Sequence, residues 1–414
     1  MTALEKIKSA KVASAALGLA TTGMKNAGLR SIAQALMANA DRIIEANGKD
    51  LASGVANGLS AGLQDRLRLD HKRIAGLAEA VELVASLPDP VGDVKRGMTL
   101  PNGLRLTQVA VPFGVVGAIY EARPNVTVDI AALALKAGNA TVLRGGSAAE
   151  NTNLLLVEVI QDALESVGLP RTSVVTVDDF GRAGAVEMMQ ARGFVDVLIP
   201  RGSASLIKAV VEESKVPVIE TGDGVVHIFI DESARAGWAT EIVFNSKVQR
   251  PSVCNALETL LIHRDALDRV GAPVLSRLQE AGVVIHGDRE IVERFDFAVP
   301  ATEEDWSAEY YSLDLAVKVV ADLDEALEHI SRYSTHHTES IVTEDNSNAE
   351  RFLKTVDSAV VMVNAATRFT DGSEFGFGAE VGISTQKLHA RGPMGLAELT
   401  STKWLVRGEG QTRA

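Results

Sequence analysis

The sequence contains a single cysteine, Cys254, in 414 residues. One cysteine excludes an intrachain disulfide framework and a cysteine-rich zinc site, and it fits a reducing compartment. Basic residues are also scarce relative to acidic ones, since 41 lysines and arginines face 54 aspartates and glutamates, which gives a net charge of −13. That balance argues against a general binder of nucleic acid or of anionic membrane surfaces, both of which attract lysine and arginine.

Long apolar runs are missing as well. No run reaches the length of a membrane-spanning helix, and Glu5 and Lys6 stand where a signal peptide has its apolar stretch. We therefore expect a soluble, cytoplasmic protein that binds neither membranes nor nucleic acid. The chain is 46% hydrophobic, so it can bury sizeable cores, and its length suggests two or three domains.

The apolar residues follow two periodicities. Residues 1–87 show helical spacing, most clearly in 24–47. From residue 104 onward strand and helix patterns alternate, with strands predicted at 104–109, 115–120, 141–144, 173–177, 195–200, 217–220 and 225–230. Such alternation predicts parallel strands joined by right-handed crossovers, as in a doubly wound nucleotide-binding sheet.

A second α/β series begins near Ser233 and carries Cys254. The tail alternates again and predicts an exposed strand that can pair with another subunit. We therefore expect four parts: a cofactor-binding domain over 1–232, in which 100–111 belong to an oligomerisation element, a catalytic domain over 233–364, a return to the cofactor domain over 365–400, and a terminal oligomerisation strand over 401–414.

Cys254 stands between a polar stretch and an apolar run. Lys247, Gln249 and Arg250 precede it, and residues 256–262 read as a buried strand, so the thiol is expected at the edge of a rigid element. Arg250 is close enough in sequence to favour the thiolate, which is the nucleophilic form. The alternative is a small buried hydrophobic side chain, the common state of a lone cysteine.

Resemblance to a known family begins in this segment, Gln249-Arg250-Pro251-Ser252-Val253-Cys254-Asn255-Ala256. It is similar to the nucleophile segment of the gamma-glutamyl phosphate reductases, a compact branch of the aldehyde dehydrogenase superfamily. A longer match runs from Val320 through Ala326-Leu327-Glu328-His329-Ile330 to Ile341, and residues 369–376 and 384–393 also look like this family. The resemblance implies an aldehyde dehydrogenase-like α/β fold with a nucleotide-binding domain, a catalytic domain and a small β oligomerisation element.

The resemblance also implies an activity. Members reduce L-glutamate 5-phosphate with NADPH to L-glutamate 5-semialdehyde and phosphate through a cysteine thioester, the second step of proline biosynthesis. It further implies a small-molecule substrate, a homo-oligomer (dimer or tetramer) and a transient contact with glutamate 5-kinase. Two alternatives remain open: an aldehyde dehydrogenase that forms an acid, and a non-catalytic member that binds NADPH as a scaffold.

No G-x-G-x-x-G follows the first strand, so the standard Rossmann fingerprint is missing. Two other turns, at 144–147 and 201–203, lead from strand to helix, and helix N-termini suit phosphate oxygens, although any α/β protein contains such turns. Ser147 and Glu150 also have the spacing of a capping box. The resemblance assigns the first turn to the adenosine ribose and the second to the pyrophosphate, so the cofactor-binding candidates are Arg144, Gly145, Ser147, Gly202 and Ser203.

Arg144 bears on the choice of cofactor. A basic residue with no acidic one close by favours the 2′-phosphate of NADP(H). The resemblance further implies that Glu309 holds the nicotinamide ribose, with an exposed surface glutamate as the alternative.

Other candidates concern the reacting groups. The resemblance implies that Asn125 donates to the oxyanion, although it could instead cap the helix that follows. Arg123 and Arg250 suit the departing phosphate or a substrate carboxylate, with solvated surface arginine as the alternative. Glu220 matches the general base of aldehyde-oxidising relatives, but a phosphate-using reductase must keep water off its thioester, so Glu220 is only a weak catalytic candidate.

Three histidines lie close together in the longer match, at 329, 336 and 337. Neither cysteine nor a convergent set of carboxylates accompanies them, so we do not expect a metal site. A polar wall near the substrate or a cluster at a helix end is the interpretation that we favour.

Overall fold

A computed structural model of the protein describes residues 1–121 and 123–413. The chain forms two compact units. The first comprises Met1–Glu220, Gly376–Gly382 and the residues from Met394 onward, and the second comprises Thr221–Phe375 and Ile383–Pro393. Within the described residues, no helix has the length and apolar character needed to cross a membrane.

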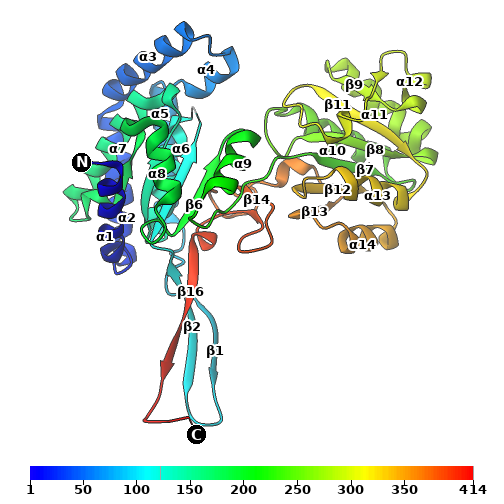
Figure 1. Ribbon diagram of the computed structural model, residues 1–414. Helices are drawn as coiled ribbons and strands as arrows, with labels where there is room; N and C mark the ends of the chain where they lie inside the picture. Colours follow the sequence, from blue (N-terminus) through cyan, green and yellow to red (C-terminus); the bar gives the residue numbers. More distant parts are fainter. Residues whose placement is uncertain (122, 414) are drawn as a thin grey trace. The chain divides into compact units, whose positions relative to one another are not determined.

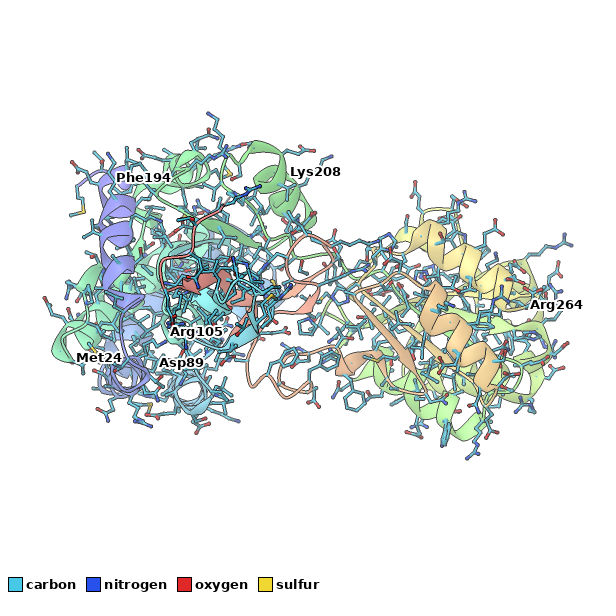
Figure 2. The ribbon with its side chains drawn as sticks, turned by 90° about the horizontal axis from the view of Figure 1, so that it is seen from below. Met24, Asp89, Arg105, Phe194, Lys208 and Arg264 are labelled. Atoms are coloured by element: carbon cyan, nitrogen blue, oxygen red, sulfur yellow. The ribbon has the colours of Figure 1, made fainter. Side chains whose placement is uncertain are left out.

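Helices fill the beginning of the first unit, as their periodicity predicts: α1 (Ala3–Leu17), α2 (Thr22–Ala38), α3 (Ala40–Ala56), α4 (Ala61–Leu67) and α5 (His71–Ser86). The side chains of Thr2 and Asp70 cap α1 and α5 by accepting backbone N–H bonds. Lys25 of α2 is buried, and its ammonium lies 2.6 Å from the carboxylate of Asp89 (labelled in Figure 2). This ion pair ties the segment after α5 to α2.

The first unit contains a four-stranded parallel sheet in the order β5-β4-β3-β6. The chain adds β4 and β5 on one side of β3 and then returns to place β6 on the other side. The prediction of a doubly wound sheet is thus confirmed, and its switch point lies between β3 and β6, where such sheets bind ligands. The elements are β3 (Val115–Tyr120), α6 (Pro124–Lys136), β4 (Ala140–Arg144), α7 (Glu150–Ser166), β5 (Val174–Thr176), α8 (Gly181–Gln190), β6 (Val197–Arg201) and α9 (Ala204–Glu213).

A separate antiparallel sheet joins β1 (Val94–Thr99), β2 (Arg105–Pro112) and β16 (Thr400–Arg407). The strand β2 lies in the middle and pairs with β16 from Arg105 to Pro112 (Figure 1). The sequence predicted β2 and β16 but not β1, whose residues are all exposed and show no alternation of apolar and polar side chains. The pairing with β2 therefore determines that β1 is a strand.

The second unit is built on a seven-stranded parallel sheet in the order β10-β9-β11-β8-β7-β12-β13. One face packs on α10–α12 and the other on α13 and α14, so the core side chains alternate, with Ile228 and Leu260 on the first face and Phe229 and Leu261 on the second. The strands are β7 (Val226–Ile230), β8 (Leu257–His263), β9 (Val284–Gly287), β10 (Val299–Pro300), β11 (Asp314–Val320), β12 (Thr338–Val342) and β13 (Val360–Val363), and the helices are α10 (Ala236–Val248), α11 (Ala272–Glu280), α12 (Arg289–Arg294), α13 (Leu323–Tyr333) and α14 (Asn346–Thr355).

The structure corrects the sheet to which residues 225–230 belong. The sequence predicted that they extend the first sheet, whereas β7 pairs with β8 and β12 in the second. A strand that is buried on both faces is apolar throughout, so its pattern does not tell which sheet it joins. Residues 221–232 accordingly lie in the second unit. The predicted return over 365–400 is also wrong in part, because 365–375 and 383–393, with β14 (Ile383–Ser384) and β15 (Gly392–Pro393), belong to the second unit, where Ser384 bridges to Thr221.

Candidate active site

Cys254 lies in a turn directly before β8 and is half-buried. The backbone N–H of Ala256 donates to the carbonyl of Val253 at 3.0 Å and closes the turn. Every residue of β8 is buried, so a rigid strand fixes the end of the turn. Arg250 is exposed near the start of the same turn. The thiol thus has the position at the edge of a strand that the sequence predicted.

The residue after the cysteine anchors a distant segment. Asn255 is buried, and its amide donates to the carbonyl of Thr370 at 2.7 Å. Its own carbonyl accepts a 2.8 Å bond from the hydroxyl of Thr367. Two bonds to consecutive parts of one chain segment therefore hold residues 367–371 beside the cysteine turn.

Gly224 packs directly against the backbone of Cys254, where an added Cβ would collide with the Cys254 carbonyl. The hydroxyl of Thr335 holds both flanks of this glycine, since it donates to the carbonyl of Asp223 at 2.6 Å and accepts the N–H of Val225 at 3.0 Å. Thr335 belongs to the longer sequence match, in the loop between α13 and β12. That loop therefore helps to position the cysteine turn.

Glu309 lies in the same neighbourhood. Its carboxylate accepts hydrogen bonds from the backbone of Gly224 and from the hydroxyl of Tyr311, and burial raises the pKa of Glu309. Tyr311 has a positive φ of 57°, which is uncommon for a residue with a side chain. Glu309 is therefore not the free surface glutamate of the alternative interpretation.

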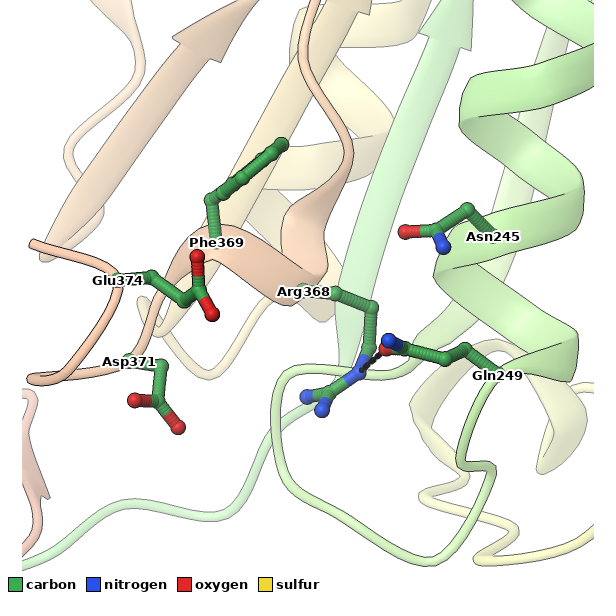
Figure 3. A pocket seen from close by; sticks show the side chains of 6 residues that line it. All are labelled: Asn245, Gln249, Arg368, Phe369, Asp371 and Glu374. Atoms are coloured by element: carbon green, nitrogen blue, oxygen red, sulfur yellow. Dashed lines mark hydrogen bonds between the residues drawn. The ribbon is translucent and has the colours of Figure 1, made fainter.

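A cavity of about 190 Å³ opens in the second unit (Figure 3). Its lining comes from α10, from the residue after it and from the segment that Asn255 anchors: Asn245, Gln249, Arg368, Phe369, Asp371 and Glu374. The Nε of half-buried Arg368 donates to the side-chain oxygen of Gln249 at 2.8 Å. Burial and the positive charge of Arg250 lower the pKa of Arg368, while the charges of Asp371, Cys254 and Glu374 act in the opposite direction.

Sequence reasoning assigned no role to Arg368, Asp371 or Glu374. The resemblance covers residues 369–376, so the sequence did indicate that this segment is a feature of the family. The bonds that bring this segment to the cysteine turn run from Asn255 to residues more than a hundred positions later. Local patterns do not reveal such contacts.

The histidines of the longer match are mainly packing groups. His329 is buried on α13 against the rings of Trp306 and Tyr333, and burial lowers its pKa to about 3. Burial also lowers the pKa of His337 to about 4. These two imidazoles are neutral at pH 7, whereas His336 is exposed with a φ of 61°.

In the first unit, Asn125 lies in the first turn of α6. Its amide Nδ2 donates to Asp129 Oδ2 at 3.0 Å, and burial raises the pKa of Asp129 to about 6. The alternative role of Asn125 as a helix cap is wrong, because Arg123 occupies the N-cap position and no side chain caps α6. An amide has a second N–H, which the bond to Asp129 does not use.

The turn after β4 contains an acidic partner that the sequence did not predict. The N–H of Gly145 donates to Asp178 Oδ1 at 2.6 Å, and burial raises the pKa of Asp178 to about 6. The Nε of Arg144 is buried without a hydrogen-bond partner among the described residues. The expectation that no acidic residue lies near Arg144 is therefore wrong, because β5 brings Asp178 to this turn from far along the chain.

The predicted capping box after β4 does not form. Ser147 begins a short 3₁₀ turn, and α7 starts at Glu150 without a side-chain cap of its own. Asp50 of α3 instead accepts the backbone N–H groups of Asn151 and Thr152, at 3.2 and 2.8 Å. A carboxylate from another helix thus satisfies the start of α7.

The turn after β6 also holds a carboxylate. Glu121 accepts both the N–H and the hydroxyl of Ser203, each at 2.9 Å, and lies against Gly202. These donors suit any anionic oxygen, including that of a phosphate, so Glu121 occupies a place that such an oxygen could take. A pyrophosphate at this turn would therefore have to displace the Glu121 carboxylate from these donors. Glu220, which ends the first segment of the first unit, is half-buried and follows a bridge between Val218 and Leu198.

The amino-acid sequence of this chain is similar to those of known proteins. The model of the aldehyde dehydrogenase family matches residues 2–291. A gamma-glutamyl phosphate reductase of Clavibacter michiganensis subsp. michiganensis is 65% identical over 411 residues, which are 99% of this chain and 95% of the relative. The gamma-glutamyl phosphate reductase of Leifsonia xyli subsp. xyli is 64% identical and covers 99% of this chain and 97% of its own.

Solved structures are similar over the whole length. The crystal structure of gamma-glutamyl phosphate reductase from Thermotoga maritima matches with a TM-score of 0.98 at 46% identity and covers 100% of both chains. An acetylating aldehyde dehydrogenase from Geobacillus thermoglucosidasius, at 20% identity and a TM-score of 0.70 over 100% and 97% of the two chains, shares the fold. This chain belongs to the aldehyde dehydrogenase family and, within it, to the gamma-glutamyl phosphate reductases.

Proposed function

We propose that this enzyme reduces L-glutamate 5-phosphate to L-glutamate 5-semialdehyde and phosphate with NADPH, the second step of proline biosynthesis. The observation that carries this function is identity of 65% with a gamma-glutamyl phosphate reductase over nearly the whole chain. The half-buried thiol at the edge of β8 supports the covalent route.

Cys254 is the proposed nucleophile. Its thiolate attacks the acyl carbon, the bond from carbon to the phosphate oxygen breaks, and phosphate leaves with that electron pair, so that a thioester remains. When bound, the nicotinamide supplies the hydride that reduces this thioester. The tetrahedral oxyanion formed in this way re-forms its C=O bond as the C–S bond breaks, which releases the aldehyde and restores the Cys254 thiolate.

Four other residues are proposed to act on the reacting groups. Asn125 offers its second amide N–H to the oxyanion. Arg123 and Arg250 are the proposed partners of the leaving phosphate, because guanidinium groups bind planar and tetrahedral oxyanions well. Glu220 stays a weak catalytic candidate, since a base that activates water would hydrolyse the thioester.

NADP(H) is the proposed form of the nicotinamide cofactor. Arg144 would bind the 2′-phosphate, with Gly145 and Ser147 in the ribose turn, Gly202 and Ser203 beside the pyrophosphate, and Glu309 at the nicotinamide ribose. The buried, unpartnered Nε of Arg144 supports a ligand at this turn. Asp178 is an opposing charge there, because burial raises its pKa only to about 6 and leaves most of the group ionised at pH 7.

One assay tests the function. The reduction of NADP⁺ is followed with glutamate 5-semialdehyde, with and without inorganic phosphate, for the wild type and for Cys254→Ser. We expect activity only with phosphate, and none for the variant. Activity that does not need phosphate and depends on Glu220 would identify an aldehyde-oxidising enzyme, and binding of NADPH without turnover would identify a non-catalytic member.

We further propose that the enzyme is a cytoplasmic homo-oligomer, a dimer or a tetramer, and that it contacts glutamate 5-kinase transiently. The single cysteine suits a reducing compartment. The exposed sheet of β1, β2 and β16 supports assembly.

A further inference from the structure

We propose that the cavity beside α10 binds the amino-acid end of the substrate, with Arg368 on its α-carboxylate and Asp371 and Glu374 facing its α-ammonium. This inference rests on the proposed function and adds to it, because it assigns the part of the substrate that takes no part in the chemistry. The ligand class is an α-amino acid zwitterion that carries a reactive carbonyl at the far end of its side chain.

The first argument is position. Asn255 follows the nucleophile and binds the segment that carries Arg368 on both sides of it, at Thr367 and Thr370. Gln249, five residues before Cys254, completes the cavity from the other side. The cysteine turn is thus connected to the cavity at both of its ends. A substrate whose carbonyl lies at the thiol can extend its remaining carbons toward this cavity.

The second argument is the charge of the lining. Arg368 provides one positive group, and Asp371 and Glu374 provide two negative ones across from it (Figure 3). A zwitterion presents the complementary pair, a carboxylate for the guanidinium and an ammonium for the carboxylates. A free phosphate dianion would face two like charges, so the cavity suits the amino-acid end better than the leaving group.

The third argument is preorganisation. The bond from Nε to Gln249 fixes the plane of the Arg368 guanidinium before the ligand arrives. Asp371 is also held in place, since its Oδ1 accepts the N–H of Ser373 at 2.9 Å. The ring of Phe369 is half exposed at the cavity and can cover the methylene groups of the substrate. Fixed charged groups lose little conformational entropy on binding, which favours affinity and specificity.

The test compares substrates that lack one charged group each. In the reverse direction, the wild type is assayed with glutamate 5-semialdehyde, with 4-aminobutanal, which lacks the carboxylate, and with 5-oxopentanoate, which lacks the amine. Arg368→Gln should lower kcat/KM for the full substrate by about 10- to 100-fold, as expected for a lost charged hydrogen bond. For 4-aminobutanal the same variant should change kcat/KM by less than about twofold, because no carboxylate is present to lose a partner.

Glu374→Gln makes the converse prediction. It should lower kcat/KM for glutamate 5-semialdehyde about tenfold and leave that for 5-oxopentanoate unchanged. Arg368→Lys keeps the charge but loses the planar fork, so its loss should be smaller than that of Arg368→Gln. The control is Arg289→Gln, which removes an arginine from the surface of the same unit, where the Arg289 side chain is 89% exposed, and should behave like the wild type.

Two results would overturn the assignment. Equal losses for all three aldehydes in Arg368→Gln and Arg368→Lys would show a general defect, and a raised KM for inorganic phosphate in these variants would place the guanidinium on the leaving group. Failure of the proposed function is separate, since it would appear as missing phosphate-dependent activity in the wild type.

Discussion

The amide of Asn125 is held by a neighbour whose ionisation is costly. Asp129 lies one helical turn further along α6 and accepts one N–H of the amide at 3.0 Å. This bond orients the amide, and its second N–H is the donor that we propose for the oxyanion. Burial raises the pKa of Asp129 from 3.8 to about 6, so the charge that orients Asn125 opposes folding near neutral pH.

The first prediction concerns this charge. A carboxyl group whose pKa is raised on folding contributes stability below its unfolded value of 3.8, and that contribution is lost as the pH rises through about 6. Asp129→Asn removes this dependence. The difference in free energy of unfolding between the variant and the wild type should therefore depend on pH. It should be about 1–3 kcal/mol more favourable to the variant at pH 8 than at pH 4. Urea unfolding of both proteins at the two pH values measures it, and a difference that does not vary with pH would contradict it.

Thr335 is linked to the cysteine turn through the backbone around Gly224. Its hydroxyl holds the carbonyl of Asp223 and the N–H of Val225, and Gly224 between them lies against Cys254. Thr335→Val keeps the shape but removes both bonds, which should free the loop and lower kcat by at least about tenfold, because small displacements at a reacting centre are costly. The pH dependence of the alkylation of Cys254 by iodoacetamide should also differ from that of the wild type. A substitution that only lowered the stability of the fold would leave this pH dependence unchanged.

A matched pair of variants separates this role from a general loss of stability. Thr335→Ser retains the hydroxyl and should recover most of the activity. Thr343 lies at the other end of β12, is buried, and donates to Asp231 at 2.7 Å, so Thr343→Val removes a similar bond far along the strand. If Thr343→Val lowered kcat and altered alkylation as much as Thr335→Val does, the positioning role would be untenable.

At the scale of elements, a buried ion pair connects α10 to β8. Lys247 and Glu258 are both fully buried, and their charged atoms lie 2.6 Å apart. Burial lowers the pKa of Lys247 and raises that of Glu258 to about 7, while the charge of each partner acts in the opposite direction. Each charged form is therefore stabilised by the other. The pair fixes the end of α10 to the strand that follows the cysteine turn.

The third prediction is a double-mutant cycle on this pair. Lys247→Met leaves the Glu258 carboxylate buried without its partner and should lower the free energy of unfolding by about 3–5 kcal/mol. Adding Glu258→Met removes the orphan charge and should restore most of that loss, because an apolar pair of similar volume avoids the desolvation of two ions. Denaturant unfolding of the four proteins gives the coupling, and additive effects of the two substitutions would contradict it.

Whether an element could be predicted from the sequence depends on whether its partners are local. Helices with a periodic apolar pattern, such as α2, and strands that form a short continuous apolar run, such as β3, follow from the sequence because the pattern is local. Three features do not follow: the sheet that β7 joins, the pairing that makes β1 a strand, and the capping of α7 by Asp50. Each is decided by a partner that lies far away in the chain.

In the molecule as a whole, some features of the candidate site also follow from local sequence and others do not. The position of Cys254 at the edge of a strand was predictable from the polar residues before it and the apolar run after it. The contacts of Thr335 with the Gly224 loop and of Arg368 with Gln249 were not, because they join segments roughly a hundred residues apart. The resemblance covers residues 320–341 and 369–376 but assigns no role to Thr335 or Arg368.

The exposed sheet leads to the last prediction. Its outer strands β1 and β16 are both edges, and Val94, Met98, Trp404 and Val406 expose 44–64% of their surface. Edges with apolar side chains favour pairing with another chain. Trp404→Glu with Val406→Glu should therefore shift the enzyme toward monomers, as measured by light scattering after size exclusion, without lowering the stability of either unit. Val12→Glu adds a charge at an exposed apolar residue of α1 and should leave the mass unchanged. An unaltered mass for the double variant would exclude this sheet as the assembly surface.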